Sequence, residues 1–331
     1  MTNNWSAPGL LEVTGSYWHG CTIMAAVNLD LFNQLAKKAE SSERLANRIG
    51  VDLRGLKMLL RALAALELLE CNEGVYSCTE AAKQFLVSGS PQYLGNIISH
   101  QHHLVESWSQ LGEAIRSGRP QRKRSSFSEK EWLESFQLGM QDLANLIAPQ
   151  LVPQIPIGNR NKMLDLGGGP GAWSIHFCQH NPGLRSSIFD LPGSRDIAEK
   201  AIQIANMTEK IDFISGDFNH DPLLDDYDFV WMSHILHGES SSNCRALITK
   251  AAAALRPDGL LIIHEFILDD HDSGPIYPAL FAINMLLGTE NGAAYTESEL
   301  GDMLAGAGLI SPERLPLPPH NKSGIIIAKK S

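Results

Sequence analysis

The sequence lacks the features of several large protein classes. It has only five cysteines in 331 residues and no Cys-x-x-Cys pair, so neither a disulfide framework nor a zinc site is indicated. Acidic residues outnumber basic ones, 37 to 27, and the net charge of −10 argues against nucleic acid as a main partner. The longest apolar runs, at 260–268 and 325–328, are too short to cross a bilayer, and residues 1–9 hold no apolar signal core. We therefore expect a cytoplasmic protein with no nucleic-acid and no membrane partner.

The sequence does contain a glycine loop at the end of an expected strand. An apolar strand at 163–166 runs into Gly-Gly-Gly-Pro-Gly at 167–171, and a helix is expected to follow. Glycine has no Cβ, so this backbone can turn sharply and lie against a ligand, next to free N–H groups at the helix start. Asp165 should fix the loop or face a cofactor. The next strand ends in Asp190, where an acid can hydrogen-bond ribose hydroxyls.

The loop alone fits two kinds of nucleotide cofactor. Gly167-x-Gly169-x-x-Ala172 matches the dinucleotide fingerprint, whereas Gly167-x-Gly169-x-Gly171 is the usual form in S-adenosylmethionine enzymes. Glycine fingerprints are weak in isolation. An NAD(P)-dependent oxidoreductase therefore stays open on the loop alone.

The amino-terminal part of the chain has a winged-helix pattern. A helix is expected at 17–36, a short helix capped by Ser41 or Ser42 and closed by Gly50, a second helix at 53–66, and a hairpin at 71–78. DNA binding would need a strongly basic second helix, and this one carries few basic residues diluted by acidic ones. We expect the domain to dimerise. A ligand-sensing winged-helix regulator is the alternative, and it depends on this pattern alone.

The carboxy-terminal part alternates strands and helices. Expected strands lie at 163–166, 186–189, 211–214, 229–232 and 260–266, and expected helices at 172–180, 194–206, 243–255, 279–287 and 297–307. Such alternation predicts a parallel sheet covered on both faces, with ligands at the carboxyl ends of the strands. A last edge strand is expected at 324–329. The expected domains are residues 1–90, 91–155 and 156–331, and the middle one contributes helices at 93–116 and 129–151.

Motifs follow the strand ends in a specific order. They are Asp-Leu-Gly-Gly-Gly-x-Gly at 165–171, Phe-Asp-Leu-Pro at 189–192, Gly-Asp-Phe at 216–218 and Leu-x-Pro-x-Gly at 255–259. In this order the chain resembles the small-molecule O-methyltransferases of the caffeic-acid and acetylserotonin type. It is most similar to their bacterial branch, which includes polyketide-tailoring enzymes of secondary metabolism. The resemblance covers nearly the whole chain, winged-helix dimerisation domain included.

The resemblance implies an α/β fold with a Rossmann-like methyltransferase sheet, S-adenosylmethionine as methyl donor, and a homodimer. In that homodimer the amino-terminal domain lends residues to the partner's substrate pocket. Together with the motifs, the resemblance implies a cofactor site at Asp165, Gly167, Gly168, Gly169, Gly171, Asp190, Leu191, Gly216, Asp217, Phe218, Met232, Ser233 and His234.

The resemblance also implies a general base. His237 stands where the family has the histidine of a His-Asp-Trp motif, and histidine is well tuned to accept a hydroxyl proton near neutral pH. Gly238 and Glu239 replace the Asp-Trp pair. The family's supporting carboxylate falls near Ala294, so we expect a substitute in Glu290 or Glu265. As a zinc pair, His234 and His237 lack a third ligand, and no metal is expected.

The expected reaction is an in-line transfer of a methyl group to a hydroxyl of a small, aromatic or polyketide-like acceptor. Methylation at nitrogen or carbon stays open. The apolar and amide side chains expected to line the acceptor pocket are Trp108, Phe127, Phe136, Met140, Phe281, Asn284, Met285 and Leu287.

Overall fold

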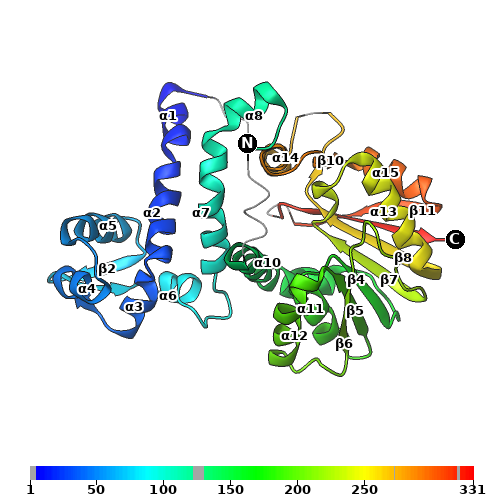
Figure 1. Cartoon of the computed structure of the whole chain (residues 1–331), viewed down its shortest axis with the longest axis horizontal. Coiled ribbons are helices and arrows are strands. Elements are labelled where there is room, and N and C mark those ends of the chain that lie inside the picture. Colours follow the sequence, from blue (N-terminus) through cyan, green and yellow to red (C-terminus); the bar gives the residue numbers. More distant parts are fainter. Residues whose placement is uncertain (1–4, 122–129, 272, 319–320) are drawn as a thin grey trace. The chain divides into compact units, whose positions relative to one another are not determined.

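A computed structural model describes residues 5–121, 130–271, 273–318 and 321–331 (Figure 1). The chain divides into two compact units, Met1–Val105 and Glu106–Ser331. Each unit has an apolar core of its own. Among the described residues, no helix combines the length and the apolar character that a membrane span requires.

The first unit is mainly helical. Its helices are α1 (Ala7–Gly15), α2 (Tyr17–Asn28), α3 (Leu31–Lys37), α4 (Ser42–Ile49), α5 (Leu53–Ala65), α6 (Glu80–Leu86) and most of α7 (Gly95–Ser109). Its short strands are β1 (Glu40–Ser41), β2 (Leu69–Asn72) and β3 (Val75–Cys78), in the order β1-β3-β2. The strands β2 and β3 form the expected hairpin after α5, which completes the winged-helix pattern.

The single helix expected at 17–36 is wrong, because the chain turns at Asp30. This residue has φ +57, in the left-handed region, and it separates α2 from α3. Its carboxylate accepts hydrogen bonds from the side chains of Asn33 and Gln34, both at 2.6 Å. An acid that bonds to its own following turn favours a break in the helix, and apolar periodicity alone does not reveal it.

The second unit holds the main sheet. Its helices are α8 (Leu111–Ser117), α10 (Lys130–Leu151), α11 (Ala172–His180), α12 (Arg195–Ile204), α13 (Ser241–Ala254), α14 (Ile276–Gly288), α15 (Glu297–Gly306) and the 3-10 turns η1 (Val152–Gln154), η2 (Pro192–Ser194) and η3 (Leu236–Gly238). Its strands are β4 (Lys162–Leu166), β5 (Arg185–Asp190), β6 (Ile211–Ser215), β7 (Tyr227–Ser233), β8 (Leu255–Glu265), β9 (Ile267–Leu268), β10 (Tyr295–Thr296), β11 (Leu309–Leu315) and β12 (Gly324–Lys330).

The main sheet has the strand order β11-β12-β8-β7-β4-β5-β6. From β8 to β6 neighbours pair in parallel, as expected, whereas β12 pairs antiparallel with both β8 and β11. The sheet is therefore mixed, and the prediction that 324–329 forms an edge strand is wrong. The edge strand on this side of the sheet is β11. The sequence did not suggest this strand, because it contains Pro312 and buries little besides Leu309.

Successive residues of the central strands point into two different cores. Trp231 and Ile262 face one core, which α10, α11 and α12 cover, while Met232 and Ile263 face the other, which α13 and α15 cover (Figure 1). A strand buried on both faces is apolar throughout, as these are. The carboxyl ends of β4, β5, β6, β7 and β8 meet at one edge of the sheet, where the motifs at 165–171, 189–192 and 216–218 lie. The motif at 255–259 begins β8 and therefore lies at the opposite edge.

Candidate active site

The loop after β4 is built on a buried carboxylate. Asp165 is fully buried, and its Oδ2 accepts hydrogen bonds from the backbone N (3.2 Å) and Oγ (2.7 Å) of Ser174 in α11. Since the Ser174 hydroxyl donates to Asp165, the Ser186 hydroxyl at 2.8 Å donates to Ser174. Burial, and to a lesser extent the charge of Asp190, raises the pKa of Asp165 to about 7. Asp165 thus fixes the loop to α11, which is one of the two roles considered for it.

The glycine loop is tight on one side and open on the other. Gly167 has φ +70, and a Cβ there would lie 2.6 Å from Ile235 and 3.5 Å from the Phe218 ring. Gly169 has φ +51, and nothing lies within 4 Å of the position of its Cβ. Glycine adopts such a backbone more readily than any other residue. The loop therefore exposes bare backbone at Gly169, as close binding of a ligand requires. Gly168 approaches Asp165, and Gly171 caps α11.

Asp190 ties the loop to the end of β5. Its Oδ2 accepts a hydrogen bond from Gly169 N (2.7 Å), and its Oδ1 accepts from Leu191 N (2.7 Å) and Ser194 Oγ (2.8 Å). Burial raises the pKa of Asp190 above its ordinary value. A carboxylate has about four acceptor sites, so these three bonds leave room on Oδ2 for a ligand hydroxyl. The loop and the acid fit the ribose end of a nucleoside cofactor.

A glutamine from α10 supports this acid, and sequence reasoning missed it. Gln137 is buried and donates from Nε2 to Ser194 Oγ at 2.6 Å, and that hydroxyl in turn donates to Asp190. Among the described side chains, Gln137 Oε1 is one of few buried polar atoms without a hydrogen-bond partner. The sequence signal was a polar residue within an amphipathic helix, which does not say which strand end the helix reaches.

Apolar side chains adjoin this acid along the chain and at the glycine loop. Leu191 directly follows it with 53% of its surface exposed. Gly216 lies so close to Phe189 that a Cβ would come within 2.3 Å of the ring, which brings the ends of β5 and β6 together. Phe218 reaches the glycine loop from the same segment. Oδ2 of Asp217 lies 2.9 Å from Nδ1 of His220. Partial burial disfavours the charge of Asp217, but the hydrogen bond with His220 keeps its pKa below the ordinary value. These walls suit a flat purine-like ring.

The end of β7 carries the next expected residues. Met232 is buried in the core under α13. Ser233 shares a hydrogen bond with Nδ1 of His264 at 2.9 Å, and burial holds the pKa of His264 well below its ordinary value. His234 adopts φ +56 and places its ring beside His264, with centroids 4.5 Å apart.

The catalytic candidate His237 is held by a buried acid. Its Nδ1 lies 2.8 Å from Oε1 of Glu265, and its backbone N donates to Oε2 at 3.3 Å. Glu265 is fully buried at the end of β8; although burial disfavours its charge, His237 and His234 hold its pKa below the ordinary value. A carboxylate only accepts hydrogen bonds, so Nδ1 of His237 carries the hydrogen and Nε2 keeps its lone pair. This is the arrangement of a general base.

Two sequence expectations about this cluster can be compared with the structure. Of the two acids considered as substitutes near Ala294, Glu265 contacts His237 and Glu290 is exposed. The expectation that His234 and His237 lack a third donor is wrong, since donor atoms of these histidines and Glu265 lie within 4.8 Å of one another. Both imidazoles have Nδ1 toward the carboxylate, at 3.2 and 2.8 Å, so the three side chains form a hydrogen-bonded cluster.

Aromatic rings line the side of His237. Phe281 of α14 meets its ring edge-on at 4.7 Å, and Phe266 lies 4.4 Å from Phe281. Tyr277 follows at 5.0 Å from Phe266, with the Lys322 ammonium 4.4 Å above its ring. Such a wall suits a flat, apolar acceptor.

The remaining acceptor candidates are spread over three helices. On α14, Asn284 is half-buried, while Met285 and Leu287 are buried. Trp108 on α7 and Phe136 and Met140 on α10 are half-buried. Phe127 lies outside the described residues. Phe281, as described above, has a ring contact to His237.

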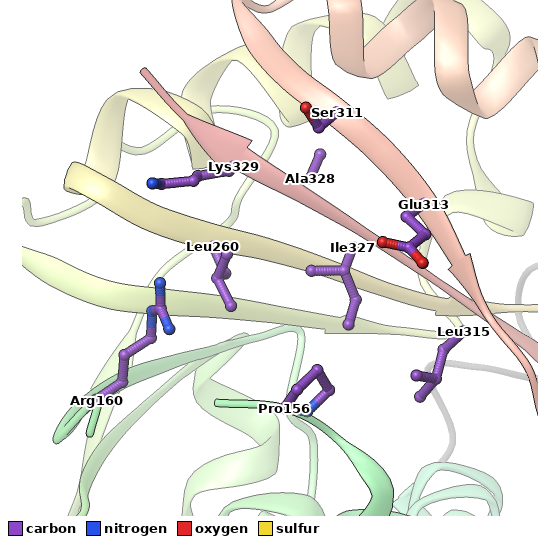
Figure 2. Close-up of a pocket in the computed structure, with 9 residues that line it drawn as sticks. All are labelled: Pro156, Arg160, Leu260, Ser311, Glu313, Leu315, Ile327, Ala328 and Lys329. Atoms are coloured by element: carbon purple, nitrogen blue, oxygen red, sulfur yellow. The ribbon is translucent and has the colours of Figure 1, made fainter. Parts of the chain in front are cut away.

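A separate hollow of about 320 Å³ is lined by residues of β8, β11 and β12 and by Pro156 and Arg160 ahead of β4 (Figure 2). Leu260, Ile327 and Leu315 are apolar residues of its lining. Both of its cationic side chains bind Asp258. Arg160 donates a hydrogen bond to the Asp258 carbonyl at 2.9 Å, and Lys329 forms an ion pair with the Asp258 carboxylate at 2.6 Å. The residues that line it do not include the glycine loop, Asp190, His237 or Glu265, so this hollow is not part of the candidate site.

Comparisons with known proteins agree with the sequence resemblance. The model of the O-methyltransferase domain matches residues 108–310, and that of the O-methyltransferase dimerisation domain matches residues 11–88. A 3-hydroxy-5-methyl-1-naphthoate 3-O-methyltransferase of Streptomyces sahachiroi is 33% identical, covering 97% of this chain and 95% of its own length. A tetracenomycin polyketide synthesis 8-O-methyl transferase of Streptomyces glaucescens is 31% identical, covering 91% of each chain.

Solved structures show the same fold. Human N-acetylserotonin methyltransferase, crystallised in complex with S-adenosylmethionine, has a TM-score of 0.88 to this chain at 23% identity, covering 100% of this chain and 99% of its own. The matches support neither an NAD(P)-dependent oxidoreductase nor a ligand-sensing regulator.

Proposed function

The chain belongs to the O-methyltransferase family, and from this premise we propose that it transfers the methyl group of S-adenosylmethionine to a phenolic hydroxyl of a small fused-ring acceptor, with His237 as general base. The observation that carries the proposal is the fixed orientation of His237, whose Nδ1 meets buried Glu265 at 2.8 Å. Its Nε2 is thereby left to accept the proton of the hydroxyl.

The strand ends support S-adenosylmethionine as the donor. The open backbone at Gly169 and the spare acceptor site on Asp190 suit a ribose, and Leu191 and Phe218 suit the adenine. When bound, the donor supplies an electrophilic methyl carbon on a sulfonium, which is already a good leaving group. The protein then has to align the acceptor and remove its proton.

The aromatic wall supports a flat acceptor. Phe281 and Phe266 stand next to His237, so a ring stacked there would present its hydroxyl toward Nε2. Two relatives are named for a hydroxynaphthoate and a tetracenomycin polyketide, which are fused aromatic acceptors. We propose the same chemical class for this chain, with oxygen as the methylated atom.

A homodimer completes the proposal. The matched dimerisation domain has large apolar side chains on α1 and α2 that its own unit leaves exposed, among them Leu11, Tyr17 and Trp18 at 74%, 64% and 68%. A second copy covering this surface would bury it. Light scattering should give twice the mass of 36.3 kDa, and a monomeric mass at micromolar concentration would contradict the proposal.

The catalytic part is tested with labelled donor and a hydroxynaphthoic acid. We expect transfer to oxygen, and His237→Ala should lower kcat by about 10²-fold or more with unchanged affinity for S-adenosylmethionine. His180→Ala is the matched control, because His180 is exposed at the end of α11. If His237→Ala were as fast as the parent at a pH where the acceptor is not ionised, His237 would not be the base.

A further inference from the structure

His234 is a conspicuous residue of the site whose role the proposed reaction leaves open. It follows β7 with φ +56, a left-handed backbone that histidine and asparagine tolerate better than most residues. Its backbone N donates to the carbonyl of His264 at 2.9 Å, which holds the turn in place. This unusual backbone turns the side chain toward Glu265 rather than along the strand.

The ring of His234 is fixed at both nitrogens. Its Nδ1 lies 3.2 Å from Oε1 of Glu265, and its Nε2 lies 3.2 Å from the Ser323 hydroxyl. The ring packs against His264 and Phe266, with centroids 4.5 and 4.3 Å away. Because the carboxylate only accepts, Nδ1 is the donor, and the neutral ring accepts from Ser323 at Nε2. The imidazole therefore has one orientation and one tautomer.

His234 and the base meet the same oxygen atom. Oε1 of Glu265 receives Nδ1–H of His234 at 3.2 Å, Nδ1–H of His237 at 2.8 Å and the backbone N–H of Phe266 at 2.8 Å. From the described part of the chain, Oε2 receives the His237 backbone N–H alone, at 3.3 Å. Three donors share one oxygen that has two lone pairs. Each donor reduces the negative charge that the others feel, so His234 weakens the attraction between Glu265 and a protonated His237.

Resting on the proposed role of His237, we propose that His234 is a positioning residue for the base: by sharing Oε1 of Glu265, it limits how strongly the carboxylate holds a proton on His237. The base is then unprotonated at a lower pH than Glu265 alone would allow. Ser323 assists, because a donor at Nε2 makes Nδ1–H of His234 a stronger donor.

Other titratable groups around the cluster do not replace His234. His264 of β8 is buried and held neutral. On α14, burial raises the pKa of Tyr277, which therefore stays uncharged, and Lys322 lies over that ring rather than at Glu265. Glu239, which follows η3, directs its carboxylate to two asparagine side chains at 3.1 and 2.8 Å. Among the described residues, the titratable side chains that donate a hydrogen bond to Glu265 are therefore His237 and His234.

The test measures kcat/KM against pH, with EDTA present, for the parent and for His234→Phe, His234→Asn and Ser323→Ala. The profile reports the protonation of the free enzyme. His234→Phe removes the donor, and its acid limb should move up by about one pH unit, equivalent to losing one charged hydrogen bond, with rates recovering at higher pH. His234→Asn keeps a donor and tolerates φ +56, so its limb should stay closer to the parent's. Ser323→Ala should shift the limb in the same direction by less.

The outcomes separate this proposal from the one it rests on. An acid limb unmoved in His234→Phe, with a raised dissociation constant for S-adenosylmethionine, would make His234 a cofactor contact and overturn the inference. If His234→Phe does not fold, Ser323→Ala decides: an unmoved limb there also overturns the inference. Failure of the proposed role of His237 would give a different result: the parent would show no acid limb, or His237→Ala would be fully active.

Discussion

The buried carboxylate of Glu265 gives the sharpest prediction. In Glu265→Gln the amide oxygen should take the place of Oε1, because three donors point at that atom, from His234, His237 and the Phe266 backbone. The amide NH2 then faces the His237 backbone N–H at the 3.3 Å site, a donor against a donor. The tautomer of His237 is therefore kept, while the negative charge that stabilises it after proton uptake is lost.

The expected cost follows from that charge. A hydrogen bond to a charged group contributes about 1.5–3 kcal/mol, so kcat should fall by roughly 10- to 100-fold. The assay is kcat at saturating donor and acceptor, with donor affinity measured by calorimetry. Glu290→Gln is the matched control, since it removes the same charge from an exposed position. A Glu265→Gln enzyme with the parent's kcat and donor affinity would refute the reasoning that the base depends on this carboxylate.

The same substitution should change stability with pH. The pKa of Glu265 is lower in the folded chain than its ordinary value. A group of this kind stabilises the fold above its unfolded pKa, and that contribution disappears as the pH falls through the folded pKa. The stability difference between parent and Glu265→Gln should therefore be present at neutral pH and shrink in acid.

Three further predictions concern the cofactor end. Asp190→Ala should weaken binding of S-adenosylmethionine by about 1–3 kcal/mol through lost hydrogen bonds, and unchanged affinity by calorimetry would exclude Asp190 from the site. Gln137→Leu removes the amide that donates a hydrogen bond to Ser194, together with a buried oxygen that has no partner. The affinity for S-adenosylmethionine should therefore fall a few-fold, while the unfolding temperature stays near the parent's. The pKa of Asp165 is raised from 3.8 to about 7 in the folded chain. The folded protein therefore loses stability as the pH rises between these two values and Asp165 ionises, by at most about 4 kcal/mol. Denaturant unfolding should therefore show that Asp165→Asn gains stability relative to the parent from pH 5 to pH 8, and a constant difference would contradict this.

The architecture of the second unit could be predicted because its signals are local. Apolar strands, a glycine loop and an acid at the next strand end follow one another along the chain, and in a parallel sheet all of them come to the same edge. The helix α11 begins and ends at the predicted residues 172 and 180. The position of β12 could not be predicted, because it depends on pairing with β11, which has no strand pattern of its own.

The sequence narrowed the acid that contacts His237 to two candidates, Glu265 and Glu290. Glu265 lies 28 residues away, and the two meet because β7 and β8 pair in parallel with Ser233 opposite His264. The sequence placed Glu265 near a strand end, and the pairing register decides that it, and not Glu290, reaches the base. The role of Gln137 could not be predicted, because a polar residue within an amphipathic helix does not indicate which strand end the helix reaches.

Glu265 holds His237 in place of the carboxylate that the family has near Ala294. In the arrangement we propose, His234 lies 3.2 Å from the same oxygen and reduces the negative charge that Glu265 presents to His237. A base held by less negative charge is unprotonated at a lower pH, but it is also a weaker proton acceptor. Such a base is adequate only when the acceptor hydroxyl is itself fairly acidic. Hydroxyls on aromatic rings meet that condition and aliphatic alcohols do not, so the charge around His237 and the aromatic wall at Phe281 point independently to the same class of acceptor.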